Sequence, residues 1–214
     1  MAIRLDSGDL AYLSKQSRKM LDEAGLDYVK IAASNQLEEN VIKSLLEQGA
    51  RIDVFGVGTN LVIGSPDAAL DGVYKLAYSN GKPRIKISES IVKVTLPHKK
   101  QVYRLRDTEG NCVGGDLVTL FEEDNIKNMI HPFEPYKQMK VDGLEKEALL
   151  KPVMENGKNK LEKKSLQEIA EYSKNRLAEL SIEYKRFNNP HIYKVGISEA
   201  LKAERDKLIA SFKN

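Results

Sequence analysis

The 214-residue sequence has a single cysteine, Cys112, so no disulfide can form within the chain. A lone cysteine is typical of proteins that work in a reducing compartment. The sequence also lacks an apolar run near the roughly 18 residues that a membrane-spanning helix needs. Its first residues include neither the basic nor the apolar segment of a signal peptide. These absences predict a cytoplasmic protein with no membrane partner.

Charge of one sign is not in large excess either. The 34 Lys and Arg residues nearly balance the 31 Asp and Glu residues, which leaves a net charge of +3. Proteins that bind nucleic acid usually gather basic side chains on one face. We therefore expect no nucleic-acid partner. With 41% hydrophobic residues, the chain can bury a core of its own.

Residues 1–66 have the pattern of three strand–helix units. The expected strands are Ile3–Asp6, Val29–Ser34 and Ile52–Val57, and their starts lie about 25 residues apart, as in βαβ units. Apolar stripes between them predict two helices, which Gly25 and Gly49 would end. Strands joined by helical crossovers should be parallel, so this segment belongs to a doubly wound sheet or an α/β barrel.

Residues 67–162 have turn signals instead of helical stripes. Asn80-Gly81 lies between the strand-like segments 72–78 and 84–88, and Pro83 favours an edge position for the second of these. A second hairpin is expected around residues 108–111. We therefore expect mostly antiparallel β structure and loops here.

Residues 163–214 are predicted to form C-terminal helices. Ser165 and Glu168 have the spacing of a capping box, and an apolar face continues from there to Phe187. Asn188-Asn189-Pro190 should end this helix. Ser198 should cap the last helix of the chain.

Polar or glycine-rich segments follow all three strands of the first segment. They are Arg4-Leu-Asp6, Ser34-Asn35 and Gly56-Val-Gly58-Thr59. Ligands of parallel α/β folds bind at the carboxyl ends of the strands, so we expect these segments to share one site.

The glycine-rich segment has two interpretations. Gly56 and Gly58 would let the backbone approach a phosphate, which the N–H groups of a following helix would bind. Alternatively, the glycines serve a tight turn that needs positive φ.

The other two segments also have structural alternatives. Asn35 could cap the second helix with Glu38 as its reciprocal partner, and Asp9 could cap the first helix. Asp6 suits a ribose diol or a metal-bound diphosphate. Arg4 lies on the same face of the strand, where its guanidinium could stack on an aromatic ring or simply pair with Asp6.

Basic and imidazole side chains elsewhere give weaker signals. Lys75 and Lys86 alternate with apolar residues in the first hairpin, which is typical of a solvated face, yet either could reach a diphosphate. His98, His131 and His191 lack metal-ligand spacing, so we expect them in loops or at the surface.

Several segments together resemble nicotinate phosphoribosyltransferase. They include "IRLDSGDLAYLSKQSRKMLDEAG", "KIAASNQLEENVIKSLLEQGARIDVFGVGTNLV", "GVYKLAYSNGKPRIKISE", "IHPFEPYK" and "SLQEIAEYSKNRLAEL". The resemblance covers nearly the whole chain, but only the C-terminal half of the family's. It implies an irregular α/β barrel of the type II phosphoribosyltransferases, of which the three βα units would be part, with an added domain.

The resemblance also implies roles for individual residues. Arg4 would pack against the pyridine ring. Asp6, the expected catalytic residue, would lie near the ribose hydroxyls and Mg²⁺. Where family members often have Asp, this chain has Gln36, which puts a carboxylate role there in doubt. The remaining residues expected to bind substrate are Ser34 and Asn35, which would face the ribose phosphate, Gly56, Gly58 and Thr59, which would hold the 5′-phosphate, and Lys75.

Family members join nicotinate to phosphoribosyl diphosphate, with ATP hydrolysis, to give nicotinate mononucleotide and diphosphate for NAD synthesis. Their dimers have active sites near the subunit contact. Because family chains are about twice as long, the resemblance implies that this chain needs a missing N-terminal half. The alternatives are an enzyme for nicotinamide or quinolinate, and a non-catalytic fragment that binds phosphate ligands or serves in assembly.

Overall fold

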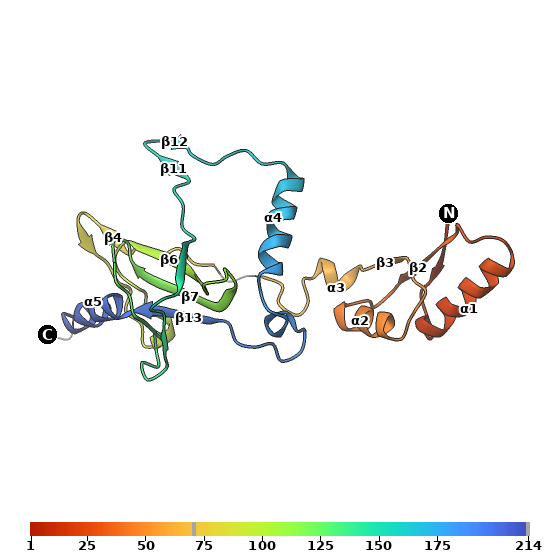
Figure 1. Ribbon diagram of the computed structural model, residues 1–214, viewed down its shortest axis with the longest axis horizontal. Coiled ribbons are helices and arrows are strands. Elements are labelled where there is room, and N and C mark those ends of the chain that lie inside the picture. The colour runs from red at the N-terminus through yellow and green to blue at the C-terminus, as the bar shows by residue number, and fades with distance from the viewer. Residues whose placement is uncertain (70–71, 213–214) are drawn as a thin grey trace. The chain divides into compact units, whose positions relative to one another are not determined.

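The computed structural model describes residues 1–69 and 72–212 (Figure 1). The chain divides into two compact units, Met1–Val73 and Tyr74–Asn214. Each unit has its own apolar cluster. The chain is therefore a mixed α/β protein with two separate cores.

The first unit contains a three-stranded parallel sheet with strand order β1-β2-β3. Its elements are β1 (Ala2–Leu5), α1 (Leu10–Glu23), β2 (Lys30–Ser34), α2 (Glu39–Glu47), β3 (Val54–Gly56) and the short α3 (Thr59–Val62). All three expected strands are present, and the crossovers between them are helical. The prediction of parallel βα units is confirmed.

Both long helices of this unit pack on one face of the sheet. Ala11 of α1 and Leu45 of α2 are buried together with Ala33 of β2, and Phe55 of β3 packs against them. Residues with the opposite orientation, such as Arg4 and Val54, are exposed. Within the first unit, the sheet thus has one face covered by helices and one face open.

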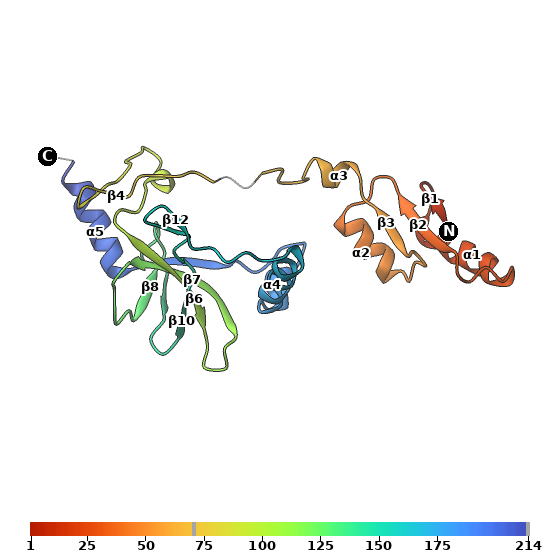
Figure 2. The same cartoon turned by 90° about the horizontal axis from the view of Figure 1, so that it is seen from above.

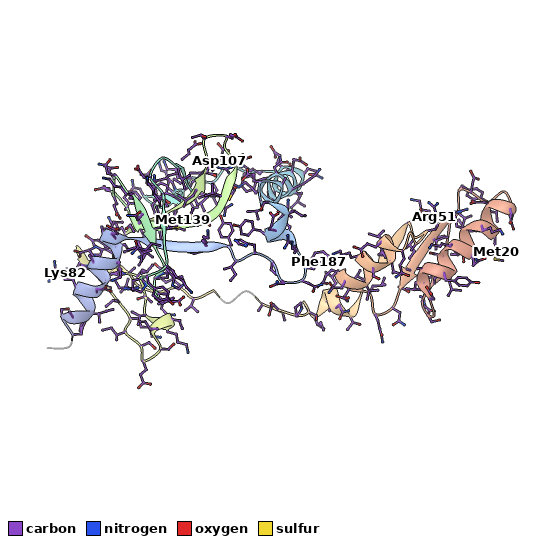
Figure 3. All side chains as sticks on the ribbon, turned by 60° about the horizontal axis from the view of Figure 1, so that its bottom comes forward. Met20, Arg51, Lys82, Asp107, Met139 and Phe187 are labelled. Atoms are coloured by element: carbon purple, nitrogen blue, oxygen red, sulfur yellow. The ribbon has the colours of Figure 1, made fainter. Side chains whose placement is uncertain are left out.

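The ends of α1 follow the expectation. Asp9 caps its start by accepting a hydrogen bond from the Tyr12 amide over 2.9 Å, and Gly25 follows its end at φ +69°. Met20, expected on the apolar face, is 68% exposed (Figure 3). The buried side of α1 is formed by Ala11 and Ser14 instead.

The predicted cap of α2 is wrong. Glu38, not Asn35, is the N-cap, and its carboxylate accepts a hydrogen bond from the Val41 amide over 2.9 Å. Asn35 and Gln36 have φ of +75° and +49°, so the chain turns at these two residues before the helix begins. That turn releases the Asn35 side chain for another contact, described below.

The second unit is organised around a six-stranded sheet with strand order β10-β6-β7-β13-β8-β9 (Figure 2). The strands are β6 (Lys100–Arg106), β7 (Cys112–Leu120), β8 (Asn128–Ile130), β9 (Gln138–Lys140), β10 (Glu145–Ala148) and β13 (Lys194–Ser198). Every pair is antiparallel except β13 with β7. The mostly antiparallel character is confirmed, but the sequence did not indicate β13.

Both expected hairpins form. Between β6 and β7, Asp107 Oδ1 accepts hydrogen bonds from the amides of Glu109 and Asn111 at 3.0 and 2.8 Å, and Asp107 is labelled in Figure 3. Asn80 and Gly81, at φ +53° and +71°, connect β4 (Tyr78–Ser79) to β5 (Lys82–Pro83). These two strands are far shorter than the expected 72–78 and 84–88.

A further hairpin and the two C-terminal helices complete this unit. They are β11 (Met154–Glu155), β12 (Lys158–Asn159), α4 (Leu166–Ala178) and α5 (Glu199–Ala210), with 3₁₀ turns at Ile91–Lys93 and Ile182–Lys185. The capping box of Ser165 with Glu168 and the cap by Ser198 are confirmed. However, α4 ends at Ala178 rather than at Phe187, because the chain becomes extended at Ser181.

The core of the second unit is formed by residues of β6, β7 and β8 and by Val141, which follows β9. Leu105, Leu117, Met129 and Val141 form its buried cluster. The helix α5 contacts β7, β8 and β13, as Figure 2 shows. Among the described residues, no helix is both long and apolar enough to span a bilayer.

Candidate functional site

Register places the carboxyl ends of the three parallel strands at one edge of the first unit's sheet. Leu5 lies beside Ala33, and Ser34 lies beside Gly56. Because side chains alternate along a strand, Arg4, Ser34 and Gly56 belong to the open face of the sheet, and Asp6 follows Leu5 at the same edge. The first unit therefore brings together all but one of the expected site residues.

Arg4 and Asp6 form an ion pair at this edge. Arg4 Nη2 lies 2.8 Å from Asp6 Oδ2, and the two side chains are 67% and 51% exposed. The hydrogen bond and the positive charge of Arg4 lower the pKa of the Asp6 carboxyl, so it is ionised at neutral pH. The structural pair considered in the sequence analysis is present, and it leaves both groups accessible to a ligand.

Asn35 holds the segment that contains Asp6. Its Nδ2 donates a hydrogen bond to the backbone carbonyl of Asp6 over 3.0 Å. The left-handed conformation of Asn35, which asparagine tolerates better than most residues, accompanies this contact. Asn35 thus ties the end of β2 to the end of β1.

The glycine-rich segment does not use its glycines for a left-handed turn. Gly58 has φ −107°, and Gly56 is not among the glycines with positive φ. A Cβ at Gly56 would meet its nearest neighbours at 3.5 Å, an ordinary contact, and one at Gly58 would meet nothing within 4 Å. The positive-φ alternative is wrong, and neighbouring atoms leave room for a Cβ at both positions. Gly58 nevertheless has φ −107° and ψ −92°, outside the regions that residues with a side chain prefer.

Two further polar residues hold the sheet together: Asn60 lies beside the carboxyl ends of the strands, and Asp53 lies at their amino ends, opposite the site. Asn60 Nδ2 donates to the Leu37 carbonyl over 3.1 Å, and Asp53 Oδ2 accepts from the Ile31 amide over 2.7 Å. Sequence reasoning missed both. The only available signal was their position beside β3, because each partner lies more than 20 residues away.

Lys75 belongs to the second unit, whereas the other expected site residues belong to the first. It lines a pocket together with two further basic residues, Arg84 and Lys86. Leu208 of α5 and Phe212, just after α5, form an apolar part of the same lining. Lys75 and Lys86, which were considered together in the sequence analysis, therefore share one pocket.

The histidines do not form a metal site. His98 Nε2 lies 3.1 Å from Glu204 Oε2, and His131 Nδ1 accepts hydrogen bonds from the amides of Phe133 and Glu134. Within residues 1–69 and 72–212, no three His, Cys, Asp or Glu side chains gather closely enough to hold a metal ion.

Comparison with known proteins shows which proteins this chain is similar to. Residues 99–204 match the family model for the nicotinate phosphoribosyltransferase C-terminal domain. The chain matches the C-terminal part of the nicotinate phosphoribosyltransferases. The Bacillus subtilis nicotinate phosphoribosyltransferase is 41% identical over 207 residues, and the Dictyostelium discoideum enzyme of the same name is 40% identical over 223 residues. These alignments cover 93% and 94% of this chain.

Solved structures agree. The crystal structure of human nicotinic acid phosphoribosyltransferase matches 97% of this chain with a TM-score of 0.71 and 28% sequence identity. That of nicotinate-nucleotide pyrophosphorylase from Pyrococcus furiosus matches 83% with a TM-score of 0.53. The chain spans 42% of the Bacillus relative and 40% of the human chain. It therefore has less than half the length of the enzymes that it resembles.

Proposed function

We propose that this chain is the C-terminal part of a nicotinate phosphoribosyltransferase. The whole enzyme would join nicotinate to phosphoribosyl diphosphate, with ATP hydrolysis, and release nicotinate mononucleotide and diphosphate for NAD biosynthesis. One observation carries the proposal: the expected polar residues of β1, β2 and β3 meet at one edge of a sheet face that no helix of the first unit covers. The identity of up to 41% to enzymes of this name supports it.

Arg4 and Asp6 would act on the base and the ribose. Breaking the bond between C1′ and the diphosphate places positive charge on the sugar, and the ionised Asp6 carboxylate would stabilise that charge. The Arg4 guanidinium would lie flat against the pyridine ring while its edge stays paired with Asp6. The ion pair would thus set the distance between the guanidinium that contacts the base and the carboxylate that faces the ribose.

The ribose 5′-phosphate would be held by residues at the ends of β2 and β3: Ser34, Asn35, Gly56, Gly58 and Thr59. The absence of side chains at Gly56 and Gly58 leaves backbone amides open to a phosphate oxygen, and the Ser34 and Thr59 hydroxyls can donate to the same group. Asn35 would contribute indirectly, because its side-chain amide donates to the Asp6 carbonyl and so holds the neighbouring strand end in place. No role in this site is proposed for Lys75, which belongs to the second unit.

Mg²⁺ fits the residues present. The ion is commonly bound through one or two carboxylates together with substrate phosphates and water, and Asp6 supplies one exposed, ionised carboxylate. When bound, Mg²⁺ would neutralise charge on the diphosphate. The chain's own contribution would be to keep Asp6 ionised and in place through Arg4 and Asn35.

The site would be completed by an N-terminal part that relatives have and this chain lacks. Purely parallel sheets are almost always covered on both faces, and here one face is open within the unit. The missing part would close β1–β3 into the irregular barrel. The enzyme would work as a cytoplasmic homodimer.

Two alternatives remain for the experiment. An enzyme for nicotinamide or quinolinate would use the same phosphate loops with another base pocket, but the relatives described above carry the nicotinate name. A non-catalytic fragment would bind phosphoribosyl diphosphate, or only a protein partner, without turnover.

A glycine substitution tests the phosphate loop, because a Cβ at Gly56, in the strand β3, fits the fold. Gly56→Ala and Asp6→Ala should each weaken Mg²⁺-phosphoribosyl diphosphate binding at least tenfold in calorimetric titration, with unchanged unfolding midpoints. Gly72→Ala, where a Cβ meets nothing within 4 Å, is the matched control. Binding that tolerates both substitutions would exclude this site.

Activity is tested by linking the chain to the N-terminal part of the Bacillus relative. The fusion should form nicotinate mononucleotide in the presence of nicotinate, ATP and Mg²⁺, whereas the chain alone should not. Robust product from the chain alone would overturn its proposed incompleteness. Product from nicotinamide or quinolinate, but not from nicotinate, would favour the first alternative.

A further inference from the structure

The segment that contains β11, β12 and α4 exposes an unusual amount of apolar surface. Figure 1 shows the β11–β12 hairpin and α4 outside the six-stranded sheet of the second unit. We define residues 149–165 as the arm. Half or more of each large apolar side chain is exposed at Leu150, Val153, Met154 and Leu161 of the arm and at Leu166, Ile169 and Leu177 of α4.

The helix α4 is attached to its own unit mainly by ion pairs. Arg176 Nη1 lies 3.1 Å from Glu147 Oε2 of β10, and Glu179, just beyond the helix, pairs with Arg106 of β6 at 2.8 Å. No residue of α4 is buried. A 13-residue helix is marginal in water unless an apolar face packs against something.

The apolar residues of α4 form one stripe. Leu166 and Leu177 are 11 positions apart and therefore lie within about 20° on a helix of 3.6 residues per turn, and Ile169 lies beside them. Arg176 and Glu179 are displaced around the helix toward the sheet. Arg176 is about 80° from Leu166 and about 100° from Leu177 but only about 20° from Ile169. The ion pairs therefore border the stripe at Ile169 and leave Leu166 and Leu177 exposed.

We propose that the stripe of α4 and the apolar residues of the arm bind the N-terminal part of the longer enzyme. This inference rests on the proposed function, because it requires that such a part exists. The alignments with relatives cover 93–98% of this chain but 37–42% of the longer proteins, so in those relatives much more structure is available to cover the corresponding segment.

Charge favours this occupant over a second copy of the chain. The arm contains five lysines and two glutamates, whereas the whole chain has a net charge of +3. In a symmetric dimer the same patch meets itself, so two basic arms would lie together and repel each other. The surface that receives the arm should instead be apolar with an acidic border.

Hydrogen exchange tests the proposal. Amides of α4 should exchange at least tenfold more slowly in the fusion with the Bacillus N-terminal part than in the chain alone. Amides of the β6–β7 turn at residues 108–111 serve as the internal reference and should not change. Equal exchange of α4 in both proteins would overturn the proposal, as would an exposed corresponding helix in the intact Bacillus enzyme.

Substitutions locate the contact. Leu166→Glu with Leu177→Glu should restore fast exchange of α4 in the fusion. Asn175→Glu is the matched control, because nine positions from Leu166 place it about 180° around the helix, and it should keep the protection. If the control removes protection equally, the stripe is not the contact.

Two other occupants give distinct results. Protection of α4 that rises with the concentration of the chain alone, together with dimers in sedimentation, would assign the stripe to a second copy. Protection in the dilute chain alone would assign it to another part of this chain. Both results would overturn the proposal.

The activity of the fusion separates this inference from the proposed function. Nicotinate mononucleotide formation with an unprotected α4 would overturn the docking surface and leave the function standing. A protected α4 without product would overturn the proposed function and leave the docking surface standing.

Discussion

Arg4 Nη2 and Asp6 Oδ2 lie 2.8 Å apart at the end of the first strand, both largely exposed. An ion pair so open to water adds little to folding stability. Its consequence is local instead: it lowers the pKa of the Asp6 carboxyl below its ordinary value and holds the guanidinium beside it. The pair is therefore better placed to serve a ligand than to hold the fold.

Replacing Arg4 should raise the pKa of Asp6. The Arg4 hydrogen bond and charge lower this pKa in the folded chain, so Arg4→Ala should return it toward that of an ordinary aspartate. The Asp6 carboxyl carbon, followed by NMR during an acid titration, measures the change. Lys43→Ala, which removes a partner of Glu47 on α2, should not alter the titration of Asp6.

Asn35 tests whether a strained loop positions Asp6. Asn35→Ala loses the hydrogen bond to the Asp6 carbonyl and places alanine at φ +75°, which together should destabilise the first unit by about 1–2 kcal/mol. Asn35→Gly loses only the hydrogen bond and should cost less. Urea unfolding followed at Tyr12 or Tyr28 measures both. Equal losses of stability in the two variants would show that the backbone conformation at residue 35 carries no strain.

Gly114 should be among the least replaceable glycines of the second unit. It has φ +72° in β7, and a Cβ there would overlap the ring of Tyr184. Gly114→Ala should cost about 2–4 kcal/mol, from the left-handed backbone and the displaced ring. Gly143→Ala, at φ +80° with nothing within 4 Å, isolates the backbone contribution at about 1–2 kcal/mol. Thermal unfolding of the two variants should differ clearly.

The prediction for Gly114→Ala can be sharpened by removing the ring of Tyr184. In a Tyr184→Ala background, Gly114→Ala should cost no more than Gly143→Ala. If the cost of Gly114→Ala is unchanged by the loss of Tyr184, the close approach of the ring is not its cause.

Glu147 should make the attachment of α4 depend on pH. Burial raises the pKa of Glu147, but hydrogen bonds from Arg106 and Arg176 outweigh burial and lower it. A lowered carboxyl pKa stabilises the fold at neutral pH, and this contribution is lost as pH falls through the folded-state pKa. Glu147→Gln should therefore cost about 1 kcal/mol at pH 7, allowing for solvent screening, and progressively less in acid.

Unfolding midpoints from pH 7 to pH 3 measure this difference. Glu23→Gln is the control, because its partner Lys19 is 3.8 Å away and both side chains are mostly exposed. That variant should change stability little at any pH. A Glu147→Gln effect that grows in acid would contradict the sign of the shift.

The sequence by itself determined features whose interactions lie within a few residues. Asp9, Ser165 and Ser198 cap their helices as predicted, because each accepts from an amide three positions ahead. Asn80-Gly81 forms its turn because both residues tolerate positive φ. The three parallel strands also followed from spacing, and with them the shared edge for Arg4, Asp6, Ser34 and Gly56.

Only the tertiary structure decided the features that depend on distant partners. Asn35 leaves the helix cap to Glu38 and binds the carbonyl of Asp6, 29 residues away. The strand β13 exists because β7, more than 70 residues earlier, offers it a parallel edge. Lys75 belongs to the second unit, beside Arg84 and Lys86. A side chain or strand takes the best partner that the folded chain brings within reach, and local sequence does not contain that partner.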